Sequence, residues 1–386
     1  MTIGRFALFL LVVSGLLGLV HYYLWARLVR APGASVRARR AAAVILGLVA
    51  VSPIVAMLSM RGPRAVAAPI SWVAFTWLGL LFFLLVSTLA FDALRGLVVF
   101  IESRQRPDRV DADRRTFFAR VAGLGASAVA GSTGVIAAAS ALSRVAVKRV
   151  SVPLASLPAA AEGYRIVQLT DVHIGPMLGR AWLDEVVRNV NALSPDIVVI
   201  TGDLVDGSVA ELQEHVQPLA ALKSKHGVFF VTGNHEYYSG ADAWIAHLGT
   251  LGIRVLRNER LPLPCGIDLA GIDDPAGRQV PGHGSDLAGA LRGRDLGRPV
   301  VLLAHQPRSI FDAARLGVAL QISGHTHGGQ MFPFNFLVRL QQPYVAGLFD
   351  HQGTQLYVSS GTGFWGPPMR LRAPPEITEI LLSHAA

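Results

Sequence analysis

Cysteine and lysine are the scarce residues of this sequence. The 386 residues include one cysteine, Cys265, so neither an intrachain disulfide framework nor a zinc cluster of several thiolates can form. We expect this single thiol to be inert and partly buried. Only three of the 35 basic residues are lysine, a bias that suggests a bacterial genome of high GC content.

Charged residues are few as well, and they are unevenly placed. They make up 16% of the chain against 52% hydrophobic residues, and the mean hydropathy of +0.43 excludes an ordinary soluble enzyme. The first 150 residues carry 18 Lys and Arg against 5 Asp and Glu, and the remainder carries 17 against 21. The basic excess therefore belongs to the apolar half. The slightly acidic remainder predicts no nucleic-acid partner.

Long hydrophobic runs account for the apolar composition. Residues 6–25, 42–60 and 68–91 are each long and apolar enough to cross a bilayer, which takes roughly 20 residues. A fourth run at 121–143 is weaker because it consists largely of glycine, alanine and serine. The sequence therefore predicts three membrane-spanning helices and a candidate fourth, with the lipid bilayer as their partner.

Arginine in the connecting loops predicts the orientation of these helices. Short cytoplasmic loops collect arginine and lysine. The first loop holds Arg27, Arg30, Arg37, Arg39 and Arg40, the second Arg61 and Arg64, and the third Arg95, Arg104, Arg106, Arg109, Arg114, Arg115 and Arg120. The first and third loops are then cytoplasmic, and a fourth span places everything beyond residue 150 on the outer face.

The fourth segment also carries features of an export signal. Arg114-Arg115-Thr116-Phe117-Phe118 before a mildly apolar run resembles a twin-arginine signal, although Asp113 stands where serine or threonine is usual. Ala139-Ser140-Ala141 matches a small-residue cleavage site. The sequence leaves open whether this segment is cleaved or retained as an anchor.

Beyond residue 163, short apolar runs alternate with amphipathic stretches. Buried strands are predicted at 165–169, 196–200, 228–231, 300–303 and 320–322, and helices at about 180–193, 209–224, 241–250 and 308–316. This alternation predicts an α/β domain with a largely buried sheet. Residues 146–163, which contain several alanines and prolines, are expected to form a linker before it.

Each of the five predicted strands leads into side chains that bind metals. The clusters are Asp171-Val172-His173, Gly202-Asp203, Gly233-Asn234-His235-Glu236, Ala304-His305 and Gly324-His325-Thr326-His327-Gly328. Because ligand sites gather at the carboxyl ends of strands in open α/β sheets, we expect these side chains to converge. Oxygen and imidazole ligands without thiolate suit Mn, Fe or Zn better than Ca or Mg.

Such a ligand set fits phosphoryl transfer. Seven ligands with one bridging carboxylate would hold two ions about 3.5–4 Å apart, which can clamp the attacking and the leaving oxygen. Water bound between two such ions ionises near neutral pH, so a bridging hydroxide replaces a serine or cysteine nucleophile.

The order of these clusters resembles that of the calcineurin-like metallophosphoesterases. The ordered pattern Asp-x-His, Gly-Asp, Gly-Asn-His-Glu, His and Gly-His-x-His runs from Asp171 to His327. The tail from Tyr357 to Thr378 is similar to the membrane-associated bacterial branch of that family. The resemblance implies a two-sheet β-sandwich flanked by helices at 164–386, after a membrane region at 1–118 and a fourth span or signal at 119–145.

The resemblance also implies a role for each residue of the site. Asp171, His173 and His327 would bind one metal ion, Asn234, His305 and His325 the second, and Asp203 would bridge the two. His235 would bind a phosphoryl oxygen and help to protonate the leaving group. Independently of the resemblance, Arg370 in the Gly- and Pro-rich stretch 365–372 is a candidate for gathering substrate phosphate.

Three functions remain open on these residues. The leading one is hydrolysis of a phosphoester, in particular a lipid-linked or cell-envelope phosphodiester, at the outer face of a bacterial cytoplasmic membrane. A UDP-diacylglucosamine-type pyrophosphatase acting on a nucleotide-linked lipid is the enzymatic alternative, and it requires a cytoplasmic site. A membrane sensor or scaffold with structural metals belongs to another class. Structural sites are closed, however, whereas this ligand set leaves room for water.

Overall fold

The computed structural model describes residues 3–60, 62–105 and 112–385. The chain divides into two compact units, which we name the helical unit and the sheet unit. The helical unit comprises Met1–Ala139 with Gly366–Met369, and the sheet unit comprises Ser140–Trp365 with Arg370–Ala386.

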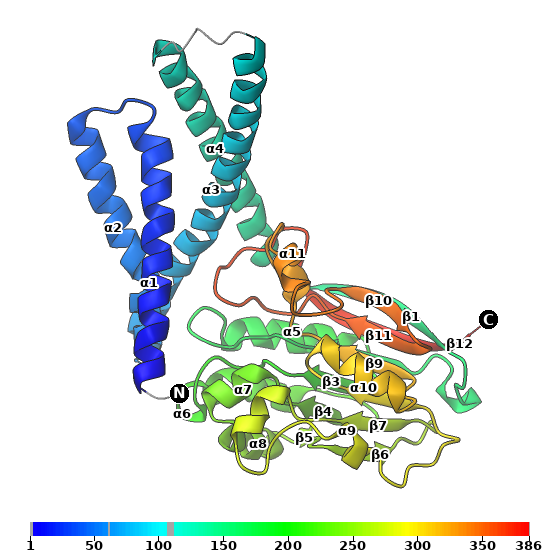
Figure 1. Ribbon diagram of the computed structural model, residues 1–386. Coiled ribbons are helices and arrows are strands. Elements are labelled where there is room, and N and C mark those ends of the chain that lie inside the picture. Colours follow the sequence, from blue (N-terminus) through cyan, green and yellow to red (C-terminus); the bar gives the residue numbers. More distant parts are fainter. Residues whose placement is uncertain (1–2, 61, 106–111, 386) are drawn as a thin grey trace. The chain divides into compact units, whose positions relative to one another are not determined.

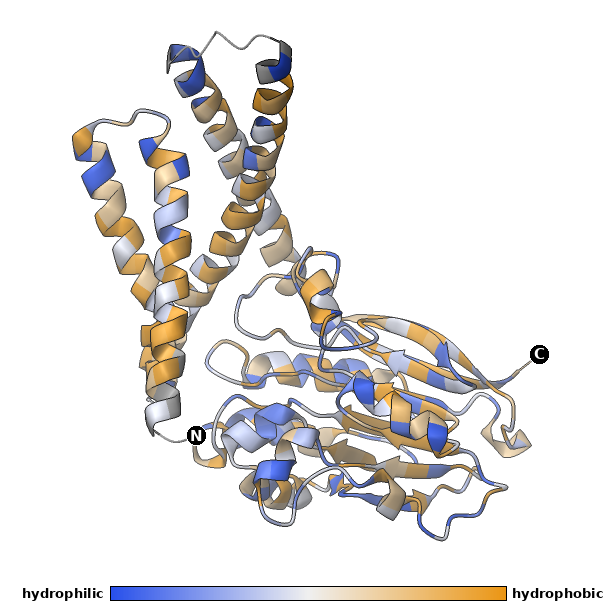
Figure 2. Ribbon diagram, viewed as in Figure 1, coloured by the Kyte–Doolittle hydropathy of each residue, from blue (hydrophilic) through white to orange (hydrophobic). Residues whose placement is uncertain are grey.

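Four long helices make up most of the helical unit. They are α1 (Ile3–Trp25), α2 (Val36–Ser59), α3 (Arg64–Gln105) and α4 (Ala112–Ala141), and a π-turn at Ala26–Arg30 follows α1. Each is long and apolar enough to cross a membrane. Figure 2 shows hydrophobic colouring along much of α1, α2 and α3, and many of their large apolar side chains are exposed, the pattern of helices in lipid.

The predicted spans coincide with these helices, but two of the helices are much longer. α3 continues to Gln105 and α4 begins at Ala112, so the boundary expected at residue 118 falls inside a helix. Hydropathy marks where a helix can lie in lipid, whereas the backbone ladder continues through charged residues. Arg114 and Arg115 of the twin-arginine-like motif lie in the first turns of α4. Arg61, Arg106 and Arg109 lie outside the described residues.

Polar side chains join α1 and its π-turn to α3. The Arg27 Nε atom lies 2.7 Å from Asp92 Oδ2, and the Tyr23 hydroxyl donates to the same oxygen at 2.6 Å. The Trp77 indole N–H donates to His21 Nε2 at 3.0 Å. Interhelical hydrogen bonds and ion pairs of this kind stabilise helix association in lipid, where apolar side chains gain little by meeting each other.

The sheet unit consists of two six-stranded sheets (Figure 1). The first has the order β1 (Ala146–Leu154), β12 (Glu376–His384), β2 (Arg165–Leu169), β3 (Ile197–Thr201), β4 (Val228–Val231) and β5 (Arg254–Val255). The second has the order β10 (Gly347–His351), β11 (Thr354–Val358), β9 (Leu320–Ser323), β8 (Val300–Leu303), β7 (Asp268–Gly271) and β6 (Glu259–Pro262). Both sheets are mixed, with a parallel centre from β2 to β5 in one and from β7 through β8 and β9 to β11 in the other.

Short helices connect and cover the strands. They are α5 (Arg180–Ala192), α6 (Val209–Val216), α7 (Asn234–Ser239), α8 (Ala241–Thr250), α9 (Leu287–Ala290), α10 (Ile310–Arg315) and α11 (Asn335–Val338). In α5, Leu183, Val186, Val187 and Val190 are buried. This spacing of three or four residues is the amphipathic pattern that predicted the helix.

The main hydrophobic core lies between the inner faces of the sheets. Alternate residues of the first sheet, such as Ile197 and Val199, share one buried cluster with Val301 and Leu303 of the second. The central strands β3, β4 and β8 are buried along their whole length, and β2 is buried except for Arg165, which explains their nearly continuous apolar sequence. Cys265 belongs to this core as a buried free thiol, and burial raises its pKa.

The segment expected as a linker, residues 146–163, contributes to the first sheet. β1 pairs in parallel with β12 from the other end of the chain, as Figure 1 shows. Its alternation was hidden because charged side chains occupy an exposed edge strand, where they find acidic partners on β12. Lys148 Nζ lies 3.2 Å from Glu376 Oε2, and Arg149 Nε lies 2.6 Å from Glu379 Oε2. Charged edge strands also resist pairing with other chains.

Candidate metal centre

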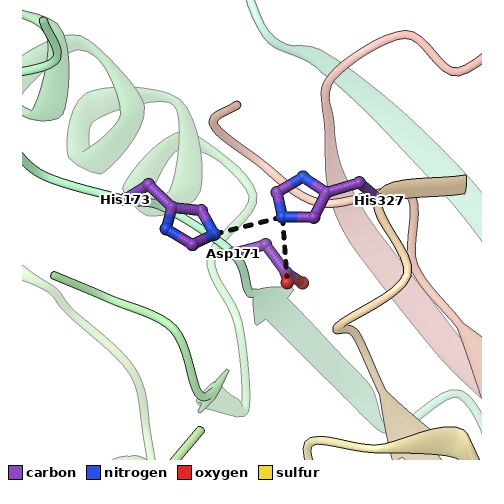
Figure 3. A group of neighbouring side chains, drawn as sticks. All are labelled: Asp171, His173 and His327. Carbon is purple, nitrogen blue, oxygen red and sulfur yellow. Dashed lines mark hydrogen bonds and ion pairs between the residues drawn. The ribbon is translucent and has the colours of Figure 1, made fainter. Parts of the chain in front are cut away.

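The loops after β2, β3, β4, β8 and β9 bring the predicted ligands together. Two groups of side chains each place their ligand atoms within 4.8 Å of one another. We name them ligand group one (Asp171, His173 and His327) and ligand group two (Asp203, His305 and His325). Figure 3 shows group one, with His173 and His327 facing each other and His327 close to Asp171.

Asp203 connects the two groups. Its Oδ2 atom lies 3.2 Å from His305 Nε2 within group two and 3.9 Å from His173 Nε2 within group one. A carboxylate placed between two sets of imidazoles in this way is suited to bridge two ions. The predicted convergence and the bridging position of Asp203 are therefore both compatible with this geometry.

Hydrogen bonds to the far ring nitrogens orient the histidines. His305 Nδ1 lies 2.7 Å from the backbone oxygen of Thr201, and His173 Nδ1 lies 3.1 Å from Asp206 Oδ1. Because both oxygens are acceptors, each Nδ1 donates a proton to its oxygen, and each Nε2 atom is left to face the centre. A hydrogen bond from the ring nitrogen that does not face the metal fixes the tautomer in which the other nitrogen can bind it.

Asn234 has an unused oxygen. Asn234 is the first residue of α7, and its Oδ1 atom is buried without a hydrogen-bond partner among the described residues. A buried amide oxygen with no donor costs about 1–3 kcal/mol, so such atoms require an explanation. A divalent cation beside Asn234 would supply the missing partner, as the sequence predicts.

The ligands stand on unusual backbone. Asp171, His173, Asp203, His325 and His327 all have positive φ angles, between 50° and 72°. L-residues other than asparagine and aspartate seldom adopt this left-handed conformation, and such strain clusters at functional sites. It re-aims each side chain at the end of a strand toward a common point.

One glycine allows the loops of the two sheets to approach this closely. A β-carbon on Gly202, which has a φ of +85°, would lie 2.6 Å from the Gly233 nitrogen and 2.7 Å from His305 Nδ1. Only glycine fits where three of the ligand loops meet. This is the physical reason for the Gly-Asp pattern in the sequence.

The centre stabilises positive charge. Asp171 and Asp203 are 0% and 2% exposed, and no Lys or Arg of the described ranges forms an ion pair with either. Burial raises the pKa of Asp203, but the charges of His305 and His235 outweigh it and hold this pKa well below its usual value. Burial and the charge of His305 lower the pKa of His325 to about 3, which leaves its imidazole neutral and able to bind metal. Buried carboxylates that form no ion pair with Lys or Arg and are surrounded by imidazoles fit a metal site.

His235 lies beside the ligand groups, next to an aspartate that sequence reasoning did not select. Asp206 Oδ1 lies 2.6 Å from His235 Nδ1 and 3.1 Å from His173 Nδ1. These three side chains form a third close set, but hydrogen bonds already join them. Asp206 follows Asp203 by three residues in the same loop, so a second carboxylate near the first was the available signal. Burial lowers the pKa of His235, but Asp203 and Asp206 outweigh it and raise this pKa to about 9.

Glu236, the last residue of its motif, belongs to neither ligand group and binds backbone N–H groups instead. Its carboxylate accepts from the backbone N–H groups of Asp203 at 3.0 Å, Leu204 at 2.8 Å and Gly233 at 2.6 Å. It is fully buried, and burial together with the charge of Asp203 raises its pKa to about 7. Glu236 therefore joins the loops after β3 and β4 and acts on the centre through their shape.

Arg370 lies behind His327. Its side chain is 0% exposed, and Nη1 donates to the backbone oxygens of Ser360 and Ala373, each at 2.8 Å. Its Nη2 atom lies 3.1 Å from His327 Nδ1. The predicted contact with substrate phosphate stays a prediction, because in this arrangement the guanidinium supports a ligand instead of facing an open site.

The C-terminal tail also forms backbone hydrogen bonds with the first ligand loop. Thr362 and Gly363 donate their backbone N–H groups to the backbone oxygens of Thr170 and Asp171, at 2.8 and 2.9 Å. The tail is thus fixed beside the first ligand loop. This explains why the similarity noted in the sequence extends beyond the last predicted ligand.

Two candidate groups of oxygen and imidazole ligands with an aspartate between them, on a two-sheet α/β sandwich, are typical of one class of protein, the dinuclear metal hydrolases. Comparison with known proteins then gives the family. Residues 164–329 match the calcineurin-like phosphoesterases. A transmembrane protein with metallophosphoesterase domain from Danio rerio is 35% identical over 396 residues, which cover 98% of this chain and 89% of that protein. The chain belongs to the calcineurin-like phosphoesterase family.

A bacterial relative carries a similar name, and one solved structure is also similar to part of the chain. An uncharacterized metallophosphoesterase of Helicobacter pylori (strain J99) is 44% identical over 220 residues, which cover 56% of this chain and 59% of that protein. Among solved structures, a dimetal phosphatase from Danio rerio covers 58% of this chain and 100% of that one, with 14% identity and a TM-score of 0.41. The predicted resemblance and fold are confirmed, and the chain is a metallophosphoesterase, an enzyme that hydrolyses phosphoesters.

Proposed function

We propose that this enzyme hydrolyses phosphodiesters at the outer face of a bacterial cytoplasmic membrane, with two divalent transition-metal ions held by the ligands of the candidate centre. The observation that carries the proposal is the arrangement around Asp203. One carboxylate reaches a ligand group on either side, and a histidine that belongs to neither group lies beside it.

Different residues of the site would bind the metal ions, donate a proton and position the proton donor. Ligand groups one and two, together with Asn234, would hold the ions, which supply Lewis-acid charge and an activated water when bound. His235 holds a proton, because its raised pKa lies above neutral pH, and it is placed to donate that proton to the leaving oxygen. Asp206 keeps the imidazole of His235 in position through Nδ1. Neighbouring cations would lower the pKa of His235 toward neutrality and make it a better acid.

A preference for diesters follows from the charges available. Arg370 contacts the predicted ligand His327, but it is buried and its donors are already engaged with backbone oxygens and with His327. A monoester dianion would require further cationic contacts, whereas a diester carries a single charge. The UDP-diacylglucosamine-type pyrophosphatase remains the enzymatic alternative if the sheet unit lies in the cytoplasm. A scaffold with structural metals is disfavoured because His235 and Asp206 add acid–base groups that such a site does not need.

Metal-dependent hydrolysis by the detergent-solubilised full chain tests the proposal. After removal and return of Mn, Fe or Zn, we expect turnover of bis(p-nitrophenyl) phosphate to exceed that of p-nitrophenyl phosphate. An Asp203→Asn variant should lose this turnover, while Asp295→Asn, on an exposed loop, should retain it. No metal-dependent turnover of either ester would contradict the hydrolase, and a preference for the monoester would contradict the diester assignment.

A further inference from the structure

An exposed apolar patch lies beside the metal centre on the sheet unit. Phe336, Leu337 and Leu340 are 58%, 56% and 82% exposed, and Phe334 and Trp365 are 43% and 54% exposed. These five side chains form what we name the apolar patch, and Figure 2 colours much of α11, which carries two of them, as hydrophobic. Single exposed apolar side chains are ordinary, but a contiguous set marks an interaction surface.

Short contacts connect this patch with the ligands. Asn335, at the start of α11, packs so closely on the turn His327–Gly329 that a β-carbon on Gly329 would lie 2.5 Å from its Cα. The Gln330 side chain donates to the Trp365 backbone oxygen at 2.9 Å and accepts from its N–H at 3.1 Å. The Trp365 ring centroid lies 5.6 Å from that of His235. Trp365 therefore lies beside the proposed acid, and Gln330 links it to the turn on which α11 packs.

The residues around the patch match the chemistry of a lipid headgroup layer. Arg339 is exposed within the same stretch, and the Arg372 guanidinium lies 5.0 Å from the centre of the Phe332 ring. On the other side of His235, Tyr238 is 70% exposed and its ring lies 5.3 Å from the imidazole. Tryptophan and tyrosine prefer the membrane–water boundary, and arginine beside apolar side chains adds attraction to lipid phosphates.

The chain itself brings the bilayer within reach. Its four apolar helices are long enough to cross a membrane, and only residues 142–145 separate the end of α4 at Ala141 from the start of β1 at Ala146. Even fully extended, these five peptide steps span no more than about 18 Å. We infer that the apolar patch docks into the headgroup layer of the membrane that the helices cross, so that phosphoesters of membrane lipids reach the metal centre without leaving the bilayer. The substrate class rests on the proposed function, whereas the docking does not.

Fluorescence quenching of the full chain tests the docking directly. In a Cys265→Ala background, Leu340→Cys is labelled with bimane and the protein is reconstituted in vesicles of phosphatidylcholine and phosphatidylglycerol with brominated acyl chains. Leu296→Cys is the matched control, since Leu296 is 83% exposed but precedes the amino end of β8, opposite the ligand at its carboxyl end. We expect the brominated lipid to quench the label at 340 several-fold more than the label at 296. Equal quenching, or a label at 340 shielded from both brominated lipid and aqueous iodide, would overturn the inference.

Kinetics then test the substrate class separately. A Phe336→Glu/Leu340→Glu variant should lower the ratio of phosphatidylglycerol hydrolysis in vesicles to bis(p-nitrophenyl) phosphate hydrolysis by about tenfold or more. The reason is that two apolar side chains that would insert into the lipid are replaced by charged ones. Leu296→Glu should leave the ratio unchanged, and an unchanged ratio in the double variant would contradict the lipid substrate. Failure of the wild type to hydrolyse the soluble ester would contradict the proposed function. The quenching experiment would still show whether the apolar patch docks into the membrane.

Discussion

His235 and Asp206 reach the centre from different loops, and their separation from the ligands can be tested residue by residue. His235 stands outside both ligand groups, and its Nε2 atom lies 3.9 Å from Asp203 Oδ2. His235→Ala should therefore lower turnover by roughly 10²–10⁴-fold, the usual range for a lost acid–base group, while the metal content stays near that of the wild type. Steady-state kinetics and elemental analysis of the same preparation provide the measurement. His247→Ala, on α8, is the matched control and should change neither quantity.

Loss of metal together with activity in His235→Ala would show that this histidine is a ligand. The Asp206→Asn variant adds a second check. Because Asp206 contacts both His235 and the predicted ligand His173, its effect on turnover should be smaller in the His235→Ala background than in the wild type, and the part that remains acts through His173.

At this scale the sequence was most informative about chemistry and least about supporting contacts. Asp171, His173 and the later clusters could be predicted as ligands because each cluster follows a recognisable strand. Nothing in the sequence distinguishes Glu236, which holds three backbone N–H groups, from a further ligand. The same limit applies to Arg370, because the sequence does not show that its guanidinium is buried against backbone oxygens.

Among the elements, the central parallel strands could be predicted from the sequence, whereas the strands at the edges of the two sheets could not. β2, β4 and β8 begin and end where continuous apolar runs predict them, because both faces of each strand are buried. β5 is two residues long, and β6 and β10 are only partly buried, so their sequences carry no clear period. The pairing of β1 with β12 joins residues about 230 positions apart, a distance at which local pattern carries no information.

The join between β2, β3 and β4 depends on one ionised aspartate. Asp196 accepts from the Arg165 backbone N–H and from Lys225 Nζ, both at 2.7 Å. Burial raises the pKa of Asp196, but the hydrogen bond from Lys225, the Arg165 N–H and the charge of Lys225 outweigh it and lower this pKa. Because the pKa of Asp196 is lower in the folded than in the unfolded chain, the ionised carboxylate stabilises the fold at pH values above its unfolded pKa of about 3.9. This contribution is lost as the pH falls through the folded-state pKa.

Asp196→Asn should therefore lower the melting temperature at neutral pH, and the difference from the wild type should shrink below about pH 4. Thermal unfolding of the solubilised full chain across that pH range is the measurement. Asp295→Asn, which is exposed, should show no such pH-dependent difference. A difference for Asp196→Asn that stayed constant down to the lowest pH would show that packing, and not charge, makes the contribution.

At the scale of the whole molecule, the helices and the enzyme domain share one chain, and the arginine distribution predicts which face carries the domain. Five arginines in the first loop and seven in the third, against two in the second, predict that the sheet unit faces outward. In a bacterial host, alkaline phosphatase fused at residue 386 should be active, and protease added to spheroplasts should cleave the sheet unit. A fusion that is inactive, with a protected domain, would reverse the orientation and favour the UDP-lipid alternative.

Two ions per chain is the central claim, and metal stoichiometry measures it most directly. Elemental analysis of the purified full chain, after reconstitution with Mn, Fe or Zn and removal of loose metal, should give close to two ions per polypeptide. Asp203→Ala removes the carboxylate shared by both ligand groups and should reduce the content to one ion or fewer, while Asp295→Ala should leave it at two. A wild type that binds one ion or none, with the same content in Asp203→Ala, would contradict the account.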